Sequence, residues 1–103
     1  MRCYRRAPLC AHPDSVVYFV GTAEGTGPVK IGYTIALARR LSEIERAEGR
    51  KMRVLSAFAG GREAERALHL RFAHRRVSGE WFERCKEVLD TAERLRGARA
   101  NGW

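Results

Sequence analysis

A chain of 103 residues is long enough for one domain with a modest core and too short for two. Its 20 lysines and arginines outnumber its 12 aspartates and glutamates, which gives a formal charge of +8 and a pI near 10.3. Such a charge favours a polyanionic partner, most often nucleic acid, but leaves open a basic protein without one. The sequence has no apolar run long enough to span a membrane and no signal-peptide pattern, so we expect an intracellular, cytoplasmic protein without a membrane partner.

The three cysteines are an odd number for a disulfide framework and indicate a reducing compartment. Cys3 and Cys10, together with His12, leave open a zinc site near the N-terminus, although no C-x-x-C pair or clear fourth ligand accompanies them. The first residues are basic and lack periodicity. We expect an irregular basic arm, a folded domain and a flexible tail, over residues 1–14, 15–96 and 97–103 respectively.

Three apolar runs predict β-strands. The first, S-V-V-Y-F-V at Ser15–Val20, is apolar on both alternating faces, as expected of a central strand. The second, Val29–Tyr33, follows a turn-rich loop and should form a hairpin with the first. The third is V-L-S-A-F at Val54–Phe58. The register that would place Tyr18 relative to Lys30 is left open by the sequence.

A helical pattern follows the second strand directly, and Thr34 can cap this helix. Its apolar stripe consists of Leu37, Leu41 and Ile44, and Gly49 is the expected stop. Because each residue advances by about 100° around a helix, Arg40 borders this stripe and Arg39 faces nearly the opposite way. Arg40 and Lys30 should therefore lie near one strand-helix corner, which is a suitable seat for a phosphate.

Two more helices are predicted further along the chain. The second begins at Arg62, and it places Glu65 and His69 four residues apart, where their side chains can touch. Its buried stripe is Ala64, Leu68 and Phe72. The third follows the basic loop H-R-R-V-S-G-E-W-F, and its amphipathic stripe is Phe82, Cys85, Val88, Leu89, Ala92 and Leu95. We interpret this last helix as core packing.

Several side chains could take part in phosphodiester cleavage. That reaction requires a nucleophile, positive charge for the transition state and help for the leaving oxygen, usually from a carboxylate-bound metal. The candidates are Tyr18, Lys30, Arg40, His69 and Glu80. Taken singly, each has an ordinary structural explanation: a core aromatic, two solvated cations, a helix-surface hydrogen bond and a carboxylate at a helix N-terminus.

The order of these residues is more informative than any one of them. The triplet Val17-Tyr18-Phe19 is followed by Lys30-Ile31-Gly32, then by Arg40 in a helix and later by Glu80. This order resembles the GIY-YIG nuclease superfamily. More narrowly, K-I-G-Y-T-x-x-L-x-x-R-L, then G-G-R-E-x-E-R-A-L-H-x-R-F, then G-E-W-F is similar to its phage-type and meiotically up-regulated branch, over about residues 15–95.

The resemblance implies an α+β fold, sandwich-like, with a three-stranded antiparallel sheet flanked by about three helices. It also implies a metal-dependent endonuclease that hydrolyses DNA with one divalent ion, Mg²⁺ or Mn²⁺. By position, Tyr18 corresponds to the tyrosine of the first motif, Gly32 to the glycine of the second, and Arg40 to the helix arginine. Glu80 corresponds to the metal-binding glutamate. Lys30 stands where many members have a tyrosine, which leaves open the group that accepts the proton.

A mechanism follows from this correspondence. Tyr18 would take a proton from the attacking water, its phenolate favoured by Lys30 and by a metal-polarised water. Arg40 would hold the scissile phosphate, and Glu80 would anchor the ion. His69 matches a histidine typical of the branch and would orient a phosphate or donate to the leaving group. Further DNA contacts are expected from Arg39, Arg75 and Arg76.

Two other classes of function stay open. One is a catalytically silent or partner-dependent nucleic-acid-binding module of the same fold, and the other is a basic scaffold protein. A nuclease this short has no separate targeting domain, so a partner protein or targeting subunit is an alternative source of specificity. A phage or mobile-element origin is consistent with the resemblance.

Overall fold

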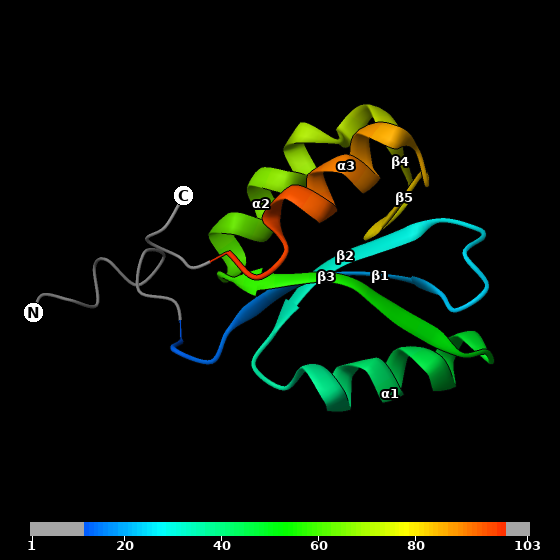
Figure 1. Cartoon of the computed structure of the whole chain (residues 1–103), viewed down its shortest axis with the longest axis horizontal. Coiled ribbons are helices and arrows are strands. Elements are labelled where there is room, and N and C mark those ends of the chain that lie inside the picture. Colours follow the sequence, from blue (N-terminus) through cyan, green and yellow to red (C-terminus); the bar gives the residue numbers. More distant parts are fainter. Residues whose placement is uncertain (1–11, 99–103) are drawn as a thin grey trace, which may run out of the picture.

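The computed structural model describes residues 12–98, which form a five-stranded antiparallel sheet with helices on both faces (Figure 1). The elements in chain order are β1 (Val16–Thr22), β2 (Val29–Thr34), α1 (Leu37–Glu48), β3 (Met52–Ala59), α2 (Arg62–Arg71), the 3₁₀ turn η2 (Ala73–Arg75), β4 (Arg76–Ser78), β5 (Trp81–Phe82) and α3 (Lys86–Leu95). The strand order is β3-β1-β2-β5-β4. Figure 1 shows α1 on one face of the sheet and α2 and α3 on the other.

The ends of the chain are only partly described. Cys3, Cys10 and most of the predicted arm lie outside the described residues, as do residues 99–103 of the predicted tail. At the other end of the described range, the Gly97 N–H donates to the Ala57 carbonyl and the Ala59 N–H donates to the Ala98 carbonyl. The chain that leaves α3 therefore returns to β3. None of the helices within residues 12–98 is long and apolar enough to cross a membrane.

β1 is the central strand that its apolar run predicted. Val17 and Phe19 belong to the core on the side of α2 and α3, whereas Tyr18 and Val20 belong to the core on the side of α1. All four residues are fully buried. A strand covered on both faces needs apolar residues at consecutive positions, which explains the unbroken run.

The two faces of the sheet support cores of different size. The larger core, between the sheet and the pair α2 and α3, consists of Val17, Phe19, Val29, Ile31, Phe58, Leu68, Phe72, Phe82, Val88 and Ala92. The smaller core, under α1, consists of Tyr18, Val20, Ile44 and Met52. Leu37 and Leu41 pack against the smaller core, so the predicted stripe of α1 faces the sheet.

The predicted number of strands was wrong, because the sheet has five strands and not three. The segment interpreted as a basic loop forms the β4-β5 hairpin, and Phe82 lies in β5 instead of in the third helix. Cys85 is the residue before α3, which begins at Lys86. A two-residue strand has no periodicity of its own. β5 exists because it pairs with β2, where Lys30 lies opposite Trp81.

The start of α1 also differs from the prediction. The Thr34 hydroxyl accepts a hydrogen bond from the Ala36 N–H at 3.0 Å, and the helix itself begins at Leu37 without a side-chain cap. Thr34 therefore closes the turn that precedes α1 and does not cap the helix. The other end agrees with the sequence, since α1 ends at Glu48, directly before Gly49.

Replacing Phe82 by alanine should lower the free energy of unfolding by about 3–5 kcal/mol, because the change removes a fully buried ring from the larger core. Chemical denaturation followed by circular dichroism measures the loss. Val77→Ala in β4 is the control, because this side chain is 56% exposed, and it should change stability by less than about 0.5 kcal/mol. Equal losses in the two variants would contradict the placement of β5 against the core.

Candidate active site

The site is organised around Tyr18 and Gly32, which lie opposite each other in the antiparallel register of β1 and β2. Directly opposed residues project toward the same face of a sheet. A Cβ added to Gly32 would collide with the Tyr18 hydroxyl, and it would lie 2.7 Å from the Tyr18 Cζ and 3.1 Å from Glu80 Oε1. Gly32 is therefore needed because the Tyr18 ring lies across its backbone. The same small space adjoins both the phenol and the carboxylate.

Glu80 reaches this space from the β4-β5 hairpin. It follows Gly79, whose φ of 55° is in the left-handed region that favours glycine. The Glu80 carbonyl accepts a hydrogen bond from the Ile31 N–H at 2.9 Å, which ties the turn to β2. Its Oε1 lies 3.5 Å from Lys30 Nζ. Strand pairing therefore positions this carboxylate, and the alternative that Glu80 begins a helix is wrong.

Arg40 approaches the phenol from α1. Its Nη1 donates to the Tyr18 hydroxyl at 3.4 Å, and its Nε donates to Glu43 Oε1 at 3.0 Å. The side chain is 41% exposed, so its guanidinium is open to a ligand while it contacts Tyr18. Arg39, one residue earlier, is exposed. The structure thus places Arg40 beside the phenol, where its fixed fork of donors suits a phosphate.

His69 lies on α2 and reaches the backbone of β2. Its Nε2 is 2.8 Å from the Ile31 carbonyl oxygen, and its ring centroid is 5.1 Å from that of Phe82. A carbonyl oxygen can only accept a hydrogen bond, so Nε2 carries the proton and donates it. His69 thereby fastens α2 to the backbone of β2 beside Gly32. In this arrangement Nδ1 of the neutral ring is an acceptor, and it could donate to a phosphate or a leaving group only in the imidazolium form.

The electrostatic state of Tyr18 differs from the expected one. Burial raises the pKa of the Tyr18 hydroxyl above its ordinary value of 10.0, and the hydrogen bond and charge of Arg40 only partly oppose this effect. The group that lowers the pKa of Tyr18 is Arg40, whereas the Lys30 ammonium pairs with Glu80 at 3.5 Å. A contribution of Lys30 to the phenolate stays a prediction. Tyr18 is consequently a protonated phenol at neutral pH in the protein alone.

Glu65 adds a second carboxylate to this neighbourhood. Burial raises the pKa of the half-buried Glu65, the charge of His69 lowers it, and the charge of Glu80 raises it. Glu80 and Glu65 also both raise the pKa of Tyr18. The two carboxylates thus disfavour a negative charge on Tyr18, and Glu80 disfavours one on Glu65; a bound cation would relieve this repulsion.

The carboxylate of Glu80 could supply one ligand to a divalent ion whose other ligands come from elsewhere. Within residues 12–98 no group of three or more histidine, cysteine, aspartate or glutamate side chains could hold a metal by itself. Mg²⁺ is usually bound through one or two carboxylates, with water and substrate phosphates filling its other positions. Glu80, half-exposed and adjoining the space at Gly32, can supply such a carboxylate.

The predicted DNA-binding arginines occupy different surroundings. Arg75 is engaged by Glu83 and Glu87, at 3.2 and 3.4 Å. The Arg76 guanidinium lies 5.4 Å from the centroid of the Phe82 ring. DNA contacts by these two residues and by Arg39 stay predictions.

Trp81 was not among the residues predicted from the sequence, and its indole centroid lies 5.0 Å from Lys30 Nζ. Its signal was the G-E-W-F motif, in which only the glutamate was assigned a role.

Comparison with known proteins gives one match. The family model described as the T5orf172 domain matches residues 15–96, the segment that carries every side chain of the site from Tyr18 to Glu80. No curated protein and no solved structure matches the chain.

Gly32→Ala should lower the free energy of unfolding by about 1–3 kcal/mol, because the added methyl group overlaps the Tyr18 hydroxyl and ring. Thermal unfolding measures the change. In the double variant Gly32→Ala/Tyr18→Phe, loss of the hydroxyl should relieve part of this cost, so the two effects should not add. Strict additivity in this double-mutant cycle would rule out the close contact.

The ionisation of Tyr18 should depend on its neighbours with a defined sign. Arg40→Ala should raise the pKa of Tyr18 further, since it removes the donor and charge that favour the phenolate, and Glu80→Gln should lower it. Because the pKa is higher in the folded state than in the unfolded one, the stability that Tyr18 contributes should decline as the pH rises through about 10 and beyond. Phenolate absorbance, measured against Tyr18→Phe, follows the titration. A lowered pKa in Arg40→Ala would contradict the assignment.

Proposed function

The chain belongs to the T5orf172 domain family, and we propose that it is a GIY-YIG-type endonuclease that hydrolyses DNA phosphodiester bonds with one divalent ion, Mg²⁺ or Mn²⁺. The family is associated with nuclease-type modules of phages, which is a nucleic-acid role. The observation that carries the finer proposal is the meeting of Tyr18, Arg40 and Glu80 around the backbone of Gly32. The net charge of +8 supports a polyanionic substrate.

Glu80 would hold the ion, with substrate phosphate and water as its other ligands. Once bound there, a divalent ion supplies Lewis-acid stabilisation of the leaving oxygen and lowers the pKa of a bound water. Because Glu80 Oε1 is 3.5 Å from Lys30 Nζ, an ion bound by this carboxylate would compete with Lys30 for it. Lys30 would then be available to a phosphate oxygen. The substrate would pair with Lys30 and the ion with Glu80, in place of the ion pair that these two side chains form in the protein alone.

Tyr18 is the proposed general base. It exposes no surface in the protein alone, so an attacking water can reach its hydroxyl only after neighbouring side chains have moved. Removing the electrostatic effect of Glu80 also removes one cause of its raised pKa. To act as the base, Tyr18 would first have to release its own phenolic proton to solvent. The phenolate would then accept a proton from the water while Arg40, already in contact with the phenol, stabilises the negative charge that develops on the phosphate.

The proposed role of His69 is to orient the site and to contact the phosphate or the leaving group. With Nε2 donating to the Ile31 carbonyl, the ring keeps one orientation, and a second proton on Nδ1 would let the imidazolium donate to a phosphate or a leaving group. The same bond holds α2 against the strand that carries Gly32. Replacing His69 should therefore disturb the position of the site as well as any direct contact with the substrate.

A binding module without catalysis is the second candidate function, and one observation favours it. In the protein alone, Glu80 is paired with Lys30 and the pKa of Tyr18 is raised, so neither group is in its reactive state. A chain that never exchanged these partners would still attract the phosphate backbone through its positive charge. The two functions differ in whether bound DNA is cut.

Purified protein should nick or cut plasmid DNA when Mg²⁺ or Mn²⁺ is present, and chelation of the ion should stop cleavage. Glu80→Gln, Tyr18→Phe and Arg40→Ala should each lower the rate by about 100-fold or more, because each removes a group needed in the transition state. Conversion of supercoiled DNA to relaxed and linear forms measures the rate.

Two matched variants control for loss of charge. Glu63→Gln and Arg46→Ala make the same chemical changes on the exposed side chains of residues outside the site, and both should cut at the rate of the unaltered protein. DNA that is retarded in a gel but never cut, with either metal, would reject the nuclease proposal in favour of the binding module.

A further inference from the structure

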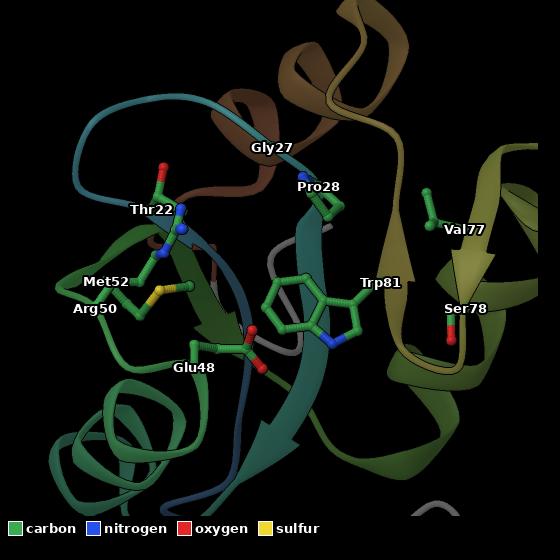
Figure 2. A pocket seen from close by; sticks show the side chains of 9 residues that line it. All are labelled: Thr22, Gly27, Pro28, Glu48, Arg50, Met52, Val77, Ser78 and Trp81. Atoms are coloured by element: carbon green, nitrogen blue, oxygen red, sulfur yellow. The ribbon is translucent and has the colours of Figure 1, made fainter.

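A pocket opens beside the proposed active site, between the β1-β2 loop, the end of α1 and the β4-β5 hairpin (Figure 2). Its volume is about 390 Å³, within the range of about 300–1,000 Å³ found for small-ligand sites. The lining residues are Thr22, Gly27, Pro28, Glu48, Arg50, Met52, Val77, Ser78 and Trp81. None of them has a role in the mechanism proposed above.

The walls of this pocket are preformed. The Thr22 hydroxyl donates to the Thr26 carbonyl at 2.7 Å and accepts from the Thr26 N–H at 3.0 Å, which closes the β1-β2 loop. Arg84 Nε donates to the Gly27 carbonyl at 3.0 Å and holds the same loop from the other side of the hairpin. Pairing with β2 fixes the backbone of Trp81. A ligand could therefore bind without rearrangement of the loop or of the backbone at Trp81.

The chemistry of the lining suits a nucleotide. Figure 2 shows the broad indole of Trp81 facing the open space, with Glu48 reaching toward it from the end of α1 and Arg50 on the far wall. Indole faces stack on nucleobases, carboxylates accept hydrogen bonds from base amino groups, and guanidinium groups bind phosphate. Among the described residues, the side chains of Glu48 and Arg50 form no ion pair with one another or with any neighbour.

The pocket adjoins the proposed catalytic groups through Trp81. Trp81 follows the metal-binding candidate Glu80 in the chain, and Lys30 Nζ lies 3.5 Å from Glu80 Oε1 and 5.0 Å from the indole centroid. A strand whose phosphate lies at Glu80 and Lys30 would thus bring a neighbouring nucleotide to Trp81. We propose that this pocket binds an unpaired nucleobase of the nucleic-acid substrate, stacked on Trp81 next to the scissile phosphate.

The base must be unpaired because both faces of a base inside a duplex are covered by its neighbours. Only a nucleotide in a single strand, a flap or a flipped position can offer a face to the indole. The inference rests on the proposed function for the position of the scissile phosphate, and it narrows the substrate class to nucleic acid with an unpaired nucleotide at the cut.

Fluorescence of Trp81 tests the proposal without any cleavage. Trp103→Phe removes the other tryptophan of the chain, and omission of divalent ions prevents turnover. A short single-stranded oligonucleotide should quench the emission of Trp81. The same strand with abasic sites keeps its phosphates, and it should bind about 10-fold more weakly and leave the emission unquenched, because stacking on the indole is lost. A hairpin-closed duplex of the same sequence should also fail to quench.

The guanidinium on the pocket wall provides a matched pair of variants. Arg50→Ala should weaken binding of the single strand by about fivefold or more, whereas Arg53→Ala, which changes the same charge three residues along the chain, should have a smaller effect. Equal quenching by intact and abasic strands, or by strand and duplex, would overturn the proposal. Quenching by the intact strand in a protein that cuts no DNA would reject the nuclease and leave the base site standing.

Discussion

The close packing of Tyr18 across Gly32 is the constraint on which the site depends. The phenol can lie on this stretch of β2 only because the opposing residue lacks a Cβ, which would overlap the hydroxyl and approach Glu80 Oε1. Packing of this kind costs side-chain freedom, and the buried ring in the smaller core offsets that cost. The hydroxyl is thereby delivered to the point where α1 contributes Arg40 and the β4-β5 hairpin contributes Glu80.

The two faces of the sheet pack against different helices and different cores. On one face, α2 and α3 cover the larger core with apolar side chains, and His69 fastens α2 to β2. On the other face, α1 packs on the smaller core of Tyr18, Val20, Ile44 and Met52. Trp81 borders this smaller core and also lines the pocket in Figure 2, so the pocket lies on the α1 side. Tyr18 and the proposed base site lie on this face, whereas His69 reaches β2 from α2 on the other.

The charges of the site are balanced internally in the protein alone. Lys30 is paired with Glu80, Arg40 donates to Tyr18, and burial keeps the phenol protonated. The carboxylates of Glu65 and Glu80 both act against a negative charge on Tyr18. A phosphate and a divalent ion bring the complementary charges together, so activation of the phenol and binding of the substrate would be one coupled event.

Local patterns in the sequence predicted most of the scaffold and several members of the site. The apolar run of β1 identified the central strand, the spacing of Leu37, Leu41 and Ile44 oriented α1, and the ordered motifs singled out Tyr18, Gly32, Arg40 and Glu80. The strand and helix features depend on neighbours one to four residues apart, whose relation is set by the strand and helix repeats. The four site residues were instead singled out by a family resemblance in the order of motifs that lie far apart in the chain. The G-E-W-F motif marked the position of Glu80 but did not reveal the hairpin that carries it.

Only the tertiary structure decided how these parts meet. The register placed Tyr18 opposite Gly32 and Lys30 opposite Val20, and the β4-β5 hairpin brought Glu80 to the Lys30 ammonium. The two-residue strand β5 exists through its pairing with β2, and with it come the position of Glu80 and the indole of Trp81 beside the pocket. Pairing between distant segments is determined by the packing of the whole core, and neither a repeat nor a motif within one segment contains that information.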